Sequence, residues 1–495
     1  MPRLGPRPDR RIVWLLHLAL LAALLVTPPL TAAPGDTDPV LGNWWGTVTA
    51  PNETVEWGLD IRRNDKGEIV VAITQPGANY FDMAVPGTAV RDGAKVRLEP
   101  LRLEGTLEGD RLSGKLGRAQ VPFELRRVAT LPALAPVPDL PTGPGPRWQT
   151  RLGGQVFASP AVADGVAYVG TTGGVFHAVK TADGSFAWTF SAGRAILGAA
   201  RLDGDALYFT CDNGYLYKLE RATGKEVWRY DLGDERVPRI LPHPAVFDWD
   251  WHAPRPLVAG GMVFVGSGDG SFHAVDAASG TRRWRATTGG KVRGGAALAG
   301  DRVIVGSADH FLYAFDRASG RELWKHDTEA AIEDEPLAIG DRVFVGNRGI
   351  GMMALSVETG EQLWRTTFWG SWLESTPALV DGVLYVGSSD LGRVSALDPA
   401  TGRVLWRSDA YGWTFGTPLV AGDRIYAGAA GGTPYFIRHV AGFLRLDRAT
   451  GKVVARWPLA DSGGHQWGIA GSLALAGDTV VATTIDGSIY AFPAS

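Results

Sequence analysis

The chain has 495 residues, which is too long for one ordinary domain and predicts two or three. Its hydrophobic residues (45%) and charged residues (20%) are typical of globular proteins, which excludes disorder for most of the sequence. The net charge is −3, with 49 basic and 52 acidic residues and no long run of either sign, so nucleic-acid binding has no electrostatic footprint. The single Cys211 excludes an intrachain disulfide, a cysteine-based zinc site and a CxxCH haem attachment.

Residues 1–33 have the pattern of an export signal. Four arginines precede the apolar stretch 12–26, and small residues follow at 31–33. About fifteen apolar residues are too few to span a bilayer, which needs roughly twenty. We expect a cleaved signal peptide, by the general or the twin-arginine route, and a periplasmic or secreted protein without an integral membrane anchor. No cysteine lies near the cleavage region, so no lipid anchor is expected either.

Residues 40–128 alternate apolar and polar side chains in short runs separated by turns such as Asp92-Gly93. This pattern predicts a small antiparallel barrel or sandwich of seven or eight strands. The opening 41–46 (LGNWWG) and the closing 105–114 (GTLEGDRLSG) loosely resemble lipocalin-like modules that precede other domains in secreted bacterial proteins. A barrel of this size could hold a ligand, but a packed interior is the favoured interpretation.

Residues 129–146 contain six prolines and show neither helical nor strand periodicity. Such a stretch favours an extended polyproline conformation and acts as a semi-rigid spacer. It separates the small domain from a larger one at 147–495.

The larger domain is built from a repeat of four short strands. In six copies a glycine stands four residues before a tryptophan, and a seventh copy (Gly451 to Trp457) is longer by two residues. Most intervals between these tryptophans are close to 40 residues, which is the period of a propeller blade. Residues 471–495 supply three further strands, and Arg147–Leu152 supplies an unmatched tryptophan strand. We therefore predict an all-β fold with an eight-bladed propeller, in which residues 147–152 pair with the strand near 488–492 and close the last blade.

The repeated pattern AxDxxTGxxxW resembles the tryptophan-docking repeat of the pyrroloquinoline-quinone (PQQ) propeller superfamily over residues 147–495. The resemblance implies the fold, but the superfamily includes both quinoprotein alcohol dehydrogenases and the propeller lipoprotein of the outer-membrane barrel assembly machinery, so it does not decide function. It assigns a structural role to one tryptophan per blade: Trp148, Trp188, Trp228, Trp284, Trp324, Trp364, Trp406 and Trp457. His177 and His273 occupy a slot filled elsewhere by tyrosine, so we interpret them as packed aromatic residues, and Cys211 as inert.

The other tryptophans of the propeller lie in the connections between blades, where they predict an aromatic-rich binding face or, alternatively, a lid over the central channel. They are Trp249, Trp251, Trp369, Trp372, Trp413 and Trp467.

Aligning the blades on their first strands predicts eight equivalent positions facing the central channel: Phe157, Leu197, Ala253, Arg293, Glu333, Glu374, Phe415 and Ala470. Three neighbouring blades thus bring Arg293, Glu333 and Glu374 together. One interpretation is that Arg293 neutralises Glu333 in a structural ion pair. The other is that Glu374, without an adjacent cation, helps to bind a cation or a polar ligand group beneath Trp372 and Trp413, because neighbouring carboxylates repel unless a positive charge lies between them.

Quinoprotein chemistry would need more than the fold. The resemblance implies a vicinal Cys-Cys ring in many members, a calcium held by Glu, Asn and Asp, and a catalytic Asp, and no motif here matches those positions. No catalytic or metal-ligating set is therefore assigned, and no cofactor is expected. The favoured hypothesis is a non-enzymatic envelope propeller that binds a protein or polymer ligand. The alternative is a PQQ- and calcium-dependent dehydrogenase of reduced design.

Overall fold

The computed structural model describes residues 38–85, 88–98, 101–117, 120–234, 239, 250–349, 351–433, 439–461, 463 and 465–494. The expected signal peptide (1–33) and Trp249 lie outside these residues. The chain forms two compact units, Met1–Pro136 and Val137–Ser495. No helix among the described residues is long and apolar enough to cross a membrane.

The first unit is one antiparallel sheet of nine described strands in the order β4-β3-β2-β1-β9-β8-β7-β6-β5. Its elements are β1 (Gly42–Ala50), β2 (Glu53–Arg63), β3 (Ile69–Gln75), the short 3-10 helix η1 (Pro76–Ala78), β4 (Tyr80–Val85), β5 (Ala89–Asp92), β6 (Lys95–Leu98), β7 (Leu103–Glu108), β8 (Arg111–Leu116) and β9 (Val121–Val128). The sheet curls into a half-barrel, so it is barrel-like as expected but has more strands than expected.

The interior of this half-barrel is packed with side chains. Trp44 is fully buried, and Trp57 meets Phe123 edge-to-face with ring centroids 5.8 Å apart. The alternation along β7 places Leu103 and Leu107 inside, so the apolar-polar pattern of the sequence maps directly onto the two faces of the sheet.

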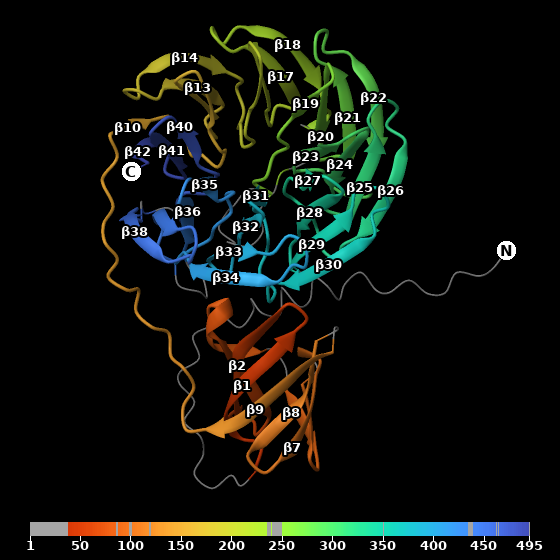
Figure 1. Ribbon diagram of the computed structural model, residues 1–495, viewed down its shortest axis with the longest axis vertical. Coiled ribbons are helices and arrows are strands. Elements are labelled where there is room, and N and C mark those ends of the chain that lie inside the picture. Colours follow the sequence, from red (N-terminus) through yellow and green to blue (C-terminus); the bar gives the residue numbers. More distant parts are fainter. Residues whose placement is uncertain are drawn as a thin grey trace, which may run out of the picture. The chain divides into compact units, whose positions relative to one another are not determined.

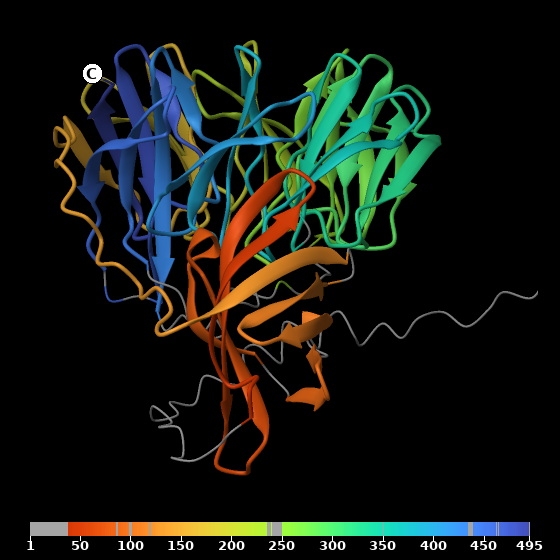
Figure 2. The same cartoon turned by 60° about the horizontal axis from the view of Figure 1, so that its bottom comes forward.

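The second unit is a ring of eight sheets standing around a common axis, with the first strand of each sheet innermost (Figure 1). Figure 2 shows the same blades from a second direction. Blades 1 to 4 comprise β11 (Ala161–Ala163), β12 (Val166–Gly170), β13 (Val175–Lys180), β14 (Phe186–Ser191); β15 (Arg201–Asp203), β16 (Ala206–Thr210), β17 (Tyr215–Glu220), β18 (Glu226–Asp231); β19 (Leu257–Ala259), β20 (Met262–Gly266), β21 (Ser271–Asp276), β22 (Arg282–Thr287); and β23 (Ala296–Ala299), β24 (Arg302–Gly306), β25 (Phe311–Asp316), β26 (Glu322–Asp327). Blades 5 to 8 comprise β27 (Leu337–Ile339), β28 (Arg342–Gly346), β29 (Gly351–Ser356), β30 (Gln362–Thr367); β31 (Ala378–Val380), β32 (Val383–Gly387), β33 (Arg393–Leu397), β34 (Val404–Asp409); β35 (Leu419–Ala421), β36 (Arg424–Gly432), β37 (Gly442–Asp447), β38 (Val453–Pro458), with β39 (Gln466–Gly468) added to β36; and β40 (Ala474–Ala476), β41 (Thr479–Thr484), β42 (Ser488–Pro493), with β10 (Trp148–Arg151).

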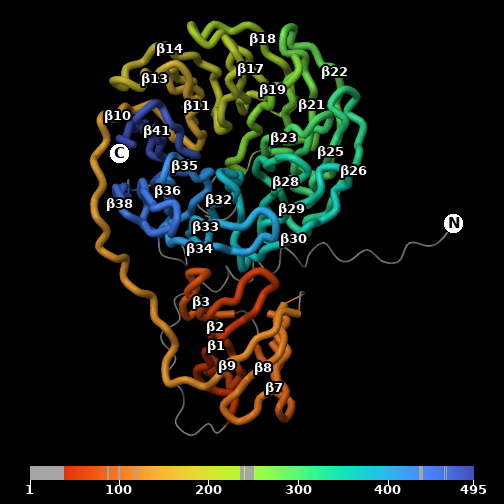
Figure 3. Tube along the Cα trace, viewed as in Figure 1, coloured from red at the N-terminus to blue at the C-terminus, as the bar shows by residue number. Residues whose placement is uncertain are grey.

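The predicted ring closure is confirmed. β10 pairs antiparallel with β42, with Trp148 opposite Ala491 and Arg151 opposite Ser488, so blade 8 takes its outer strand from the start of the ring. Figure 3 shows β10 and β41 in the same blade, and β42 stands between them in the sheet. Outside the ladder, Arg147 pairs with Asp478 at 2.6 Å between Nη2 and Oδ2.

The repeated tryptophans join neighbouring blades, as the repeat predicted. Seven of the eight rings, all except that of Trp457, pack on the turn glycine of the next blade. In six of these seven the Nε1 also donates to a backbone carbonyl there; Trp284, for example, bonds to the carbonyl of Arg317 at 2.9 Å. The same hydrogen bond recurs for Trp148, Trp188, Trp228, Trp324 and Trp364, with Thr181, Arg221, Ala277, Val357 and Pro399 as acceptors.

Part of the proline-rich stretch lies against the ring and is not a free spacer. The carbonyl of Pro141 accepts from the backbone N–H of Arg456 at 2.9 Å, and Gly143 donates back to the Arg456 carbonyl at 3.3 Å. Gly145 lies next to the ring of Trp457. Blade 8 has no glycine turn for Trp457, so the extended stretch covers this tryptophan and the exposed edge of β38.

Candidate functional site

A cavity of about 340 Å³ lies on the axis of the ring, lined by residues from all eight blades. All eight positions aligned from the sequence line it: Phe157, Leu197, Ala253, Arg293, Glu333, Glu374, Phe415 and Ala470. Each stands just before the innermost strand of its blade, so the repeat geometry brings eight distant segments to one place. The cavity has an apolar half, from blades 7, 8, 1 and 2, and a charged sector, from blades 4 to 6.

The apolar half is centred on Trp251, which comes from the long connection between blades 2 and 3. Its ring lies 5.7 Å from the ring of Phe157 and 5.3 Å from that of Phe415. It also stacks on His252 at 3.9 Å. Trp251 is only 6% exposed, so it packs inside the ring and does not form part of an open rim.

The charged sector is organised by Arg348, which the sequence analysis missed. Its Nη2 lies 2.9 Å from Glu333 Oε2 and 2.5 Å from Glu374 Oε1, and its guanidinium stacks on Trp372 with 4.5 Å to the ring centroid. Burial alone would raise the pKa of Glu374, but Arg348 and His252 outweigh it and lower that pKa to about 2. The prediction that Glu374 has no adjacent cation is therefore wrong, because Arg348 occupies the place beneath Trp372.

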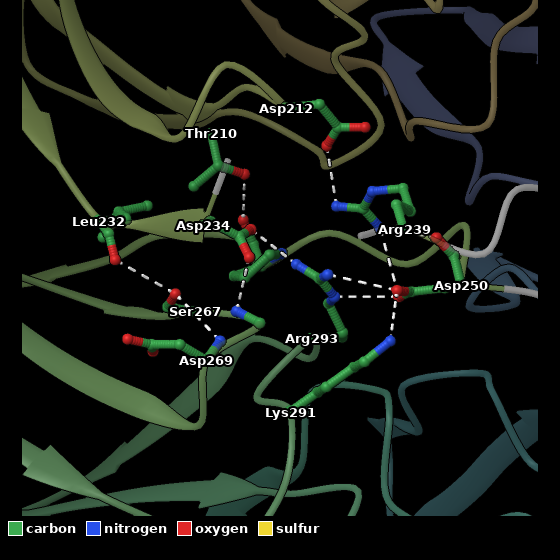
Figure 4. A network of polar contacts seen from close by, with 12 residues as sticks. Thr210, Asp212, Leu232, Asp234, Arg239, Asp250, Ser267, Asp269, Lys291 and Arg293 are labelled. Carbon is green, nitrogen blue, oxygen red and sulfur yellow. Dashed lines mark hydrogen bonds and ion pairs between the residues drawn. The ribbon is translucent and has the colours of Figure 1, made fainter. Parts of the chain in front are cut away.

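Arg293 is also fully engaged, but not with Glu333. It is 1% exposed, and it bonds to Asp250 at 2.9 Å (Nε to Oδ1) and to Asp234 at 2.6 Å (Nη1 to Oδ2). Figure 4 shows this network, in which Lys291 and Arg239 also converge on Asp250. Burial opposes charge on Asp250, but Arg293 and Arg239 hold its pKa below the usual value. The predicted Arg293–Glu333 pair is thus replaced by two separate clusters, each with its own arginine.

This network positions the apolar half of the cavity. Arg239 donates to the backbone carbonyls of Asp250 and His252, at 2.7 and 2.6 Å, and pairs with Asp212 of blade 2 at 2.8 Å. The segment that carries Trp251 is therefore tied to blade 2 through Asp212 and to blade 4 through Arg293.

Asp334, next to Glu333, behaves differently from its neighbours. Its Oδ1 accepts from the Glu335 backbone N–H at 2.7 Å and from Thr376 Oγ1 at 2.9 Å, whereas its Oδ2 is buried without a hydrogen-bond partner among the described residues. Burial raises the pKa of Asp334 to about 7. This carboxyl group therefore carries a proton for part of the time at neutral pH.

The remaining connection tryptophans are packed against the ring to different degrees. Trp413 and Trp467 are 2% and 9% exposed, and both meet the extension of β36, at Ala430 and Gly431. Trp369 and Trp372 are half-buried. The described tryptophans are thus packed against the ring, and the extension of β36 covers two of them. This packing favours the lid interpretation over an exposed aromatic rim.

His252, Glu333 and Glu374 have ligand atoms within 4.8 Å of one another, a spacing that could hold a metal ion. The Arg348 guanidinium, however, already lies between the two carboxylates. A calcium ion would have to displace a buried guanidinium, so this donor set does not fit the calcium and quinone that the alternative hypothesis requires.

Three weaker candidates, two histidines and the cysteine, are buried. His273 is buried and its Nδ1 lies 3.1 Å from the Tyr230 hydroxyl, and His177 is 5% exposed. Cys211 is buried, and burial raises the pKa of its thiol to about 11, which makes it a poor nucleophile.

A signal for Arg348 was present in the repeat. The second residue after the second strand is Thr172, Gly268, Ala308 and Ser389 in blades 1, 3, 4 and 6. An arginine in a slot that usually holds a small residue marks a side chain that must reach into the channel. Asp212, the charged member of this slot in blade 2, is likewise an ion-pair partner.

The sequence profile of the family described as "Outer membrane protein assembly factor BamB" matches residues 141–237, 190–291, 269–371 and 354–495. The chain belongs to this family. These matches together span the whole ring, and they confirm the resemblance inferred from the tryptophan repeat. The lipocalin likeness of residues 40–128 stays a prediction.

Individual BamB relatives are distant. The protein of this name from Burkholderia pseudomallei (strain K96243) is 26% identical over 326 residues, covering 58% of this chain and 82% of that protein. The one from Yersinia pestis is 24% identical over 147 residues, covering 29% of this chain and only 36% of the relative.

Quinohemoprotein alcohol dehydrogenase from Comamonas testosteroni is also similar, at 30% identity over 149 residues, which cover 26% of this chain and 19% of the enzyme. Its crystal structure superposes with a TM-score of 0.54 at 15% identity, over 71% of this chain and 76% of the enzyme. This likeness concerns the fold alone.

Proposed function

We propose that the protein is a non-enzymatic propeller of the cell envelope that binds a protein partner, as the family description of an assembly factor suggests. The observation that carries the proposal is Arg348, which neutralises Glu333 and Glu374, two of the three members of the described cluster whose spacing could hold a metal ion. Arg293 is likewise saturated by Asp234 and Asp250, so these two arginine clusters serve the fold.

The outer strands of the blades support a protein as the ligand. Exposed apolar side chains recur beside the docking tryptophans: Phe186 (45% exposed), Val227 (48%), Leu363 (48%) and Leu405 (39%). Leu363 and Leu405 lie in neighbouring blades 5 and 6. Apolar side chains at the edge of a sheet favour protein contact over contact with a hydrophilic polymer.

Site-specific photocross-linking tests the protein partner. A photoreactive residue at Leu363 or Leu405 should give the same discrete product with one envelope protein of the native host. The matched control is Asp341, whose side chain is 91% exposed but which lies in a polar turn of blade 5. Products that are equally diffuse at all three positions would contradict the proposal.

The dehydrogenase alternative is tested with the purified full chain. Incubation with PQQ and calcium, followed by gel filtration, should leave no quinone absorbance with the protein and no alcohol-dependent dye reduction. A stoichiometric quinone spectrum with dye reduction would overturn the non-enzymatic proposal in favour of the enzyme.

A further inference from the structure

We propose that the central cavity binds a small organic cation, a protonated amine attached to an apolar or aromatic group, with Asp334 as its counter-ion. This site is separate from the protein contacts of the proposed function, and either can fail without the other.

Asp334 is the carboxylate of this sector that no guanidinium or ammonium group neutralises among the described residues. Glu333 and Glu374 share Arg348, and Glu335 lies 3.6 Å from both Arg201 and Arg255. The Asp334 side chain is held in place through Oδ1 by Thr376 and the backbone of Glu335, while Oδ2 has no such bond. A carboxylate fixed on one oxygen and unsatisfied on the other is a built acceptor for a donor from a ligand.

A second group of the cavity wall is also unsatisfied. His252 is 9% exposed, and its Nε2 makes no hydrogen bond among the described residues, although it lies 3.4 Å from Glu374 Oε1. A ring nitrogen that faces a carboxylate is a donor, so of these two groups only Asp334 Oδ2 is an acceptor, and an acceptor suits the N–H bonds of an ammonium.

The wall across the ring from Asp334 is aromatic. In a ring of eight blades, blade 5 with Asp334 stands opposite blade 1 with Phe157, and Trp251 and Phe415 extend this wall. A volume of about 340 Å³ accommodates a small organic molecule with one ring. Aromatic faces attract cations as well as apolar groups, so both ends of the cavity favour the same ligand class.

Other ligand classes fit less well. An anion would need a cationic partner on the cavity wall, but Arg293 is saturated by two carboxylates and Arg255 already faces Glu335 at 3.6 Å. A metal ion would compete with Arg348 at the only described cluster with suitable spacing. Burial raises the pKa of Asp334 to about 7, so this carboxyl group is partly protonated at neutral pH. An ammonium that binds at Oδ2 displaces at most this one proton, and its partner is then a full carboxylate.

Isothermal titration calorimetry of the full chain at pH 8 tests this inference with three probes of one shape: benzylammonium, benzyl alcohol and benzoate. We expect benzylammonium to bind at one site per chain, benzyl alcohol at least ten-fold more weakly, and benzoate not measurably. Equal affinity for benzyl alcohol, tighter binding of benzoate, or no binding of benzylammonium would each overturn the proposal.

The role of the Asp334 charge is tested with Asp334→Asn. This substitution preserves the shape of the side chain and should weaken benzylammonium binding at least ten-fold. The matched control is Asp301→Asn, at a turn of blade 4 where the side chain is 72% exposed, and it should leave the isotherm unchanged. If Asp334→Asn does not fold, Thr376→Val removes the hydrogen bond that orients the carboxylate and should weaken binding of the same probe. An unchanged isotherm in a folded Asp334→Asn or Thr376→Val protein would contradict the assignment.

Discussion

Buried charges in the ring depend on the pairing of each arginine with two carboxylates. Arg348 joins Glu333 of its own blade to Glu374 of the next, and Arg293 joins Asp234 to Asp250. Removing one partner of a buried ion pair leaves an uncompensated buried charge, which strongly destabilises the protein. The intact pair, in contrast, adds little stability compared with apolar residues of similar volume. These arginines are therefore points at which a single substitution has a large effect.

Arg348→Ala should destabilise the ring by about 3–5 kcal/mol, because two buried carboxylates lose their cation. Chemical unfolding followed by tryptophan fluorescence measures this. Arg365→Ala is the control. Arg365 lies 2.7 Å from Glu329, but the two side chains are 32% and 42% exposed. Ion pairs that are exposed to this extent contribute at most about 1 kcal/mol. Similar losses for the two variants would show that the Arg348 cluster is not desolvated.

Asp334 should make the free energy of unfolding depend on pH between about pH 4 and 7. Its folded-state pKa, about 7, lies above the unfolded value near 3.9, so the folded protein retains a proton that the unfolded chain has lost. The free energy of unfolding should therefore fall as pH rises through this range, by up to about 1.4 kcal/mol per pH unit, and this fall should be absent in Asp334→Asn.

The measurement is the difference between wild type and Asp334→Asn in urea unfolding at pH 4.5, 6 and 7.5. The difference is needed because His273 and His439, whose pKa values burial lowers to about 4, make stability rise with pH over the same interval. Glu374, with a pKa of about 2, loses its contribution only as pH falls below about 4 and does not interfere. A constant difference across the three pH values would contradict the raised pKa.

At the scale of elements, the tryptophan and glycine of the repeat act as one joint between blades. The turn glycines adopt the left-handed region; Gly320, for instance, has φ +73°, and a Cβ there would lie 2.6 Å from the ring of Trp284. The glycine thus serves both the turn and the close approach of the preceding blade.

Gly320→Ala and Gly340→Ala separate these two roles. Gly340 also has a positive φ, +62°, but nothing lies within 4 Å of an added Cβ. Both variants pay the backbone cost of about 1–2 kcal/mol, and Gly320→Ala should lose about 1–3 kcal/mol more through the clash. Thermal melting with tryptophan fluorescence compares them, and equal melting temperatures would mean that the joint adapts without cost.

The element scale is also where the sequence was most informative. The spacing of glycine and Trp324 or Trp364 predicted blade number, strand order and the closing strand, because those features repeat and errors in one copy are corrected by the others. The equivalent channel positions followed from the same alignment. Ion-pair partners did not follow from it: Asp250 lies in a connection that has no repeat, and Arg348, although it departs from its repeat slot, has carboxylate partners that only the three-dimensional structure shows.

At the scale of the whole molecule, the ring is closed by β10 and by the proline-rich stretch before it. β10 completes blade 8, and Pro141–Gly143 bonds to Arg456 on blade 7. The two segments are consecutive in sequence, so residues 141–151 hold the last two blades together. This seam differs from the other joints between blades, in which the tryptophan of one repeat packs on the turn glycine of the next.

Trp148→Ala should lower the melting temperature of the ring, at a cost of about 3 kcal/mol, since its half-buried ring fills the joint to blade 1 and its Nε1 bonds to Thr181. Trp148→Phe is the matched control, which retains most of the apolar contact and loses the hydrogen bond, at about 1 kcal/mol. If Trp148→Ala melts with the wild type, the closing strand does not hold the ring together.

The seam also determines which strand pairing of the ring forms late in folding. Gln149 bonds to Ser488 across 339 residues of sequence, so the closing strand is synthesised before blades 1 to 7 and must wait for the rest of its sheet. Each earlier blade forms from local contacts, whereas this pairing has the highest contact order in the ring and comes late in folding. Until then the edges of β10 and β42 are unpaired and prone to wrong partners. A chain interrupted before β42 would keep that exposed edge, so closure of the ring distinguishes complete from incomplete molecules.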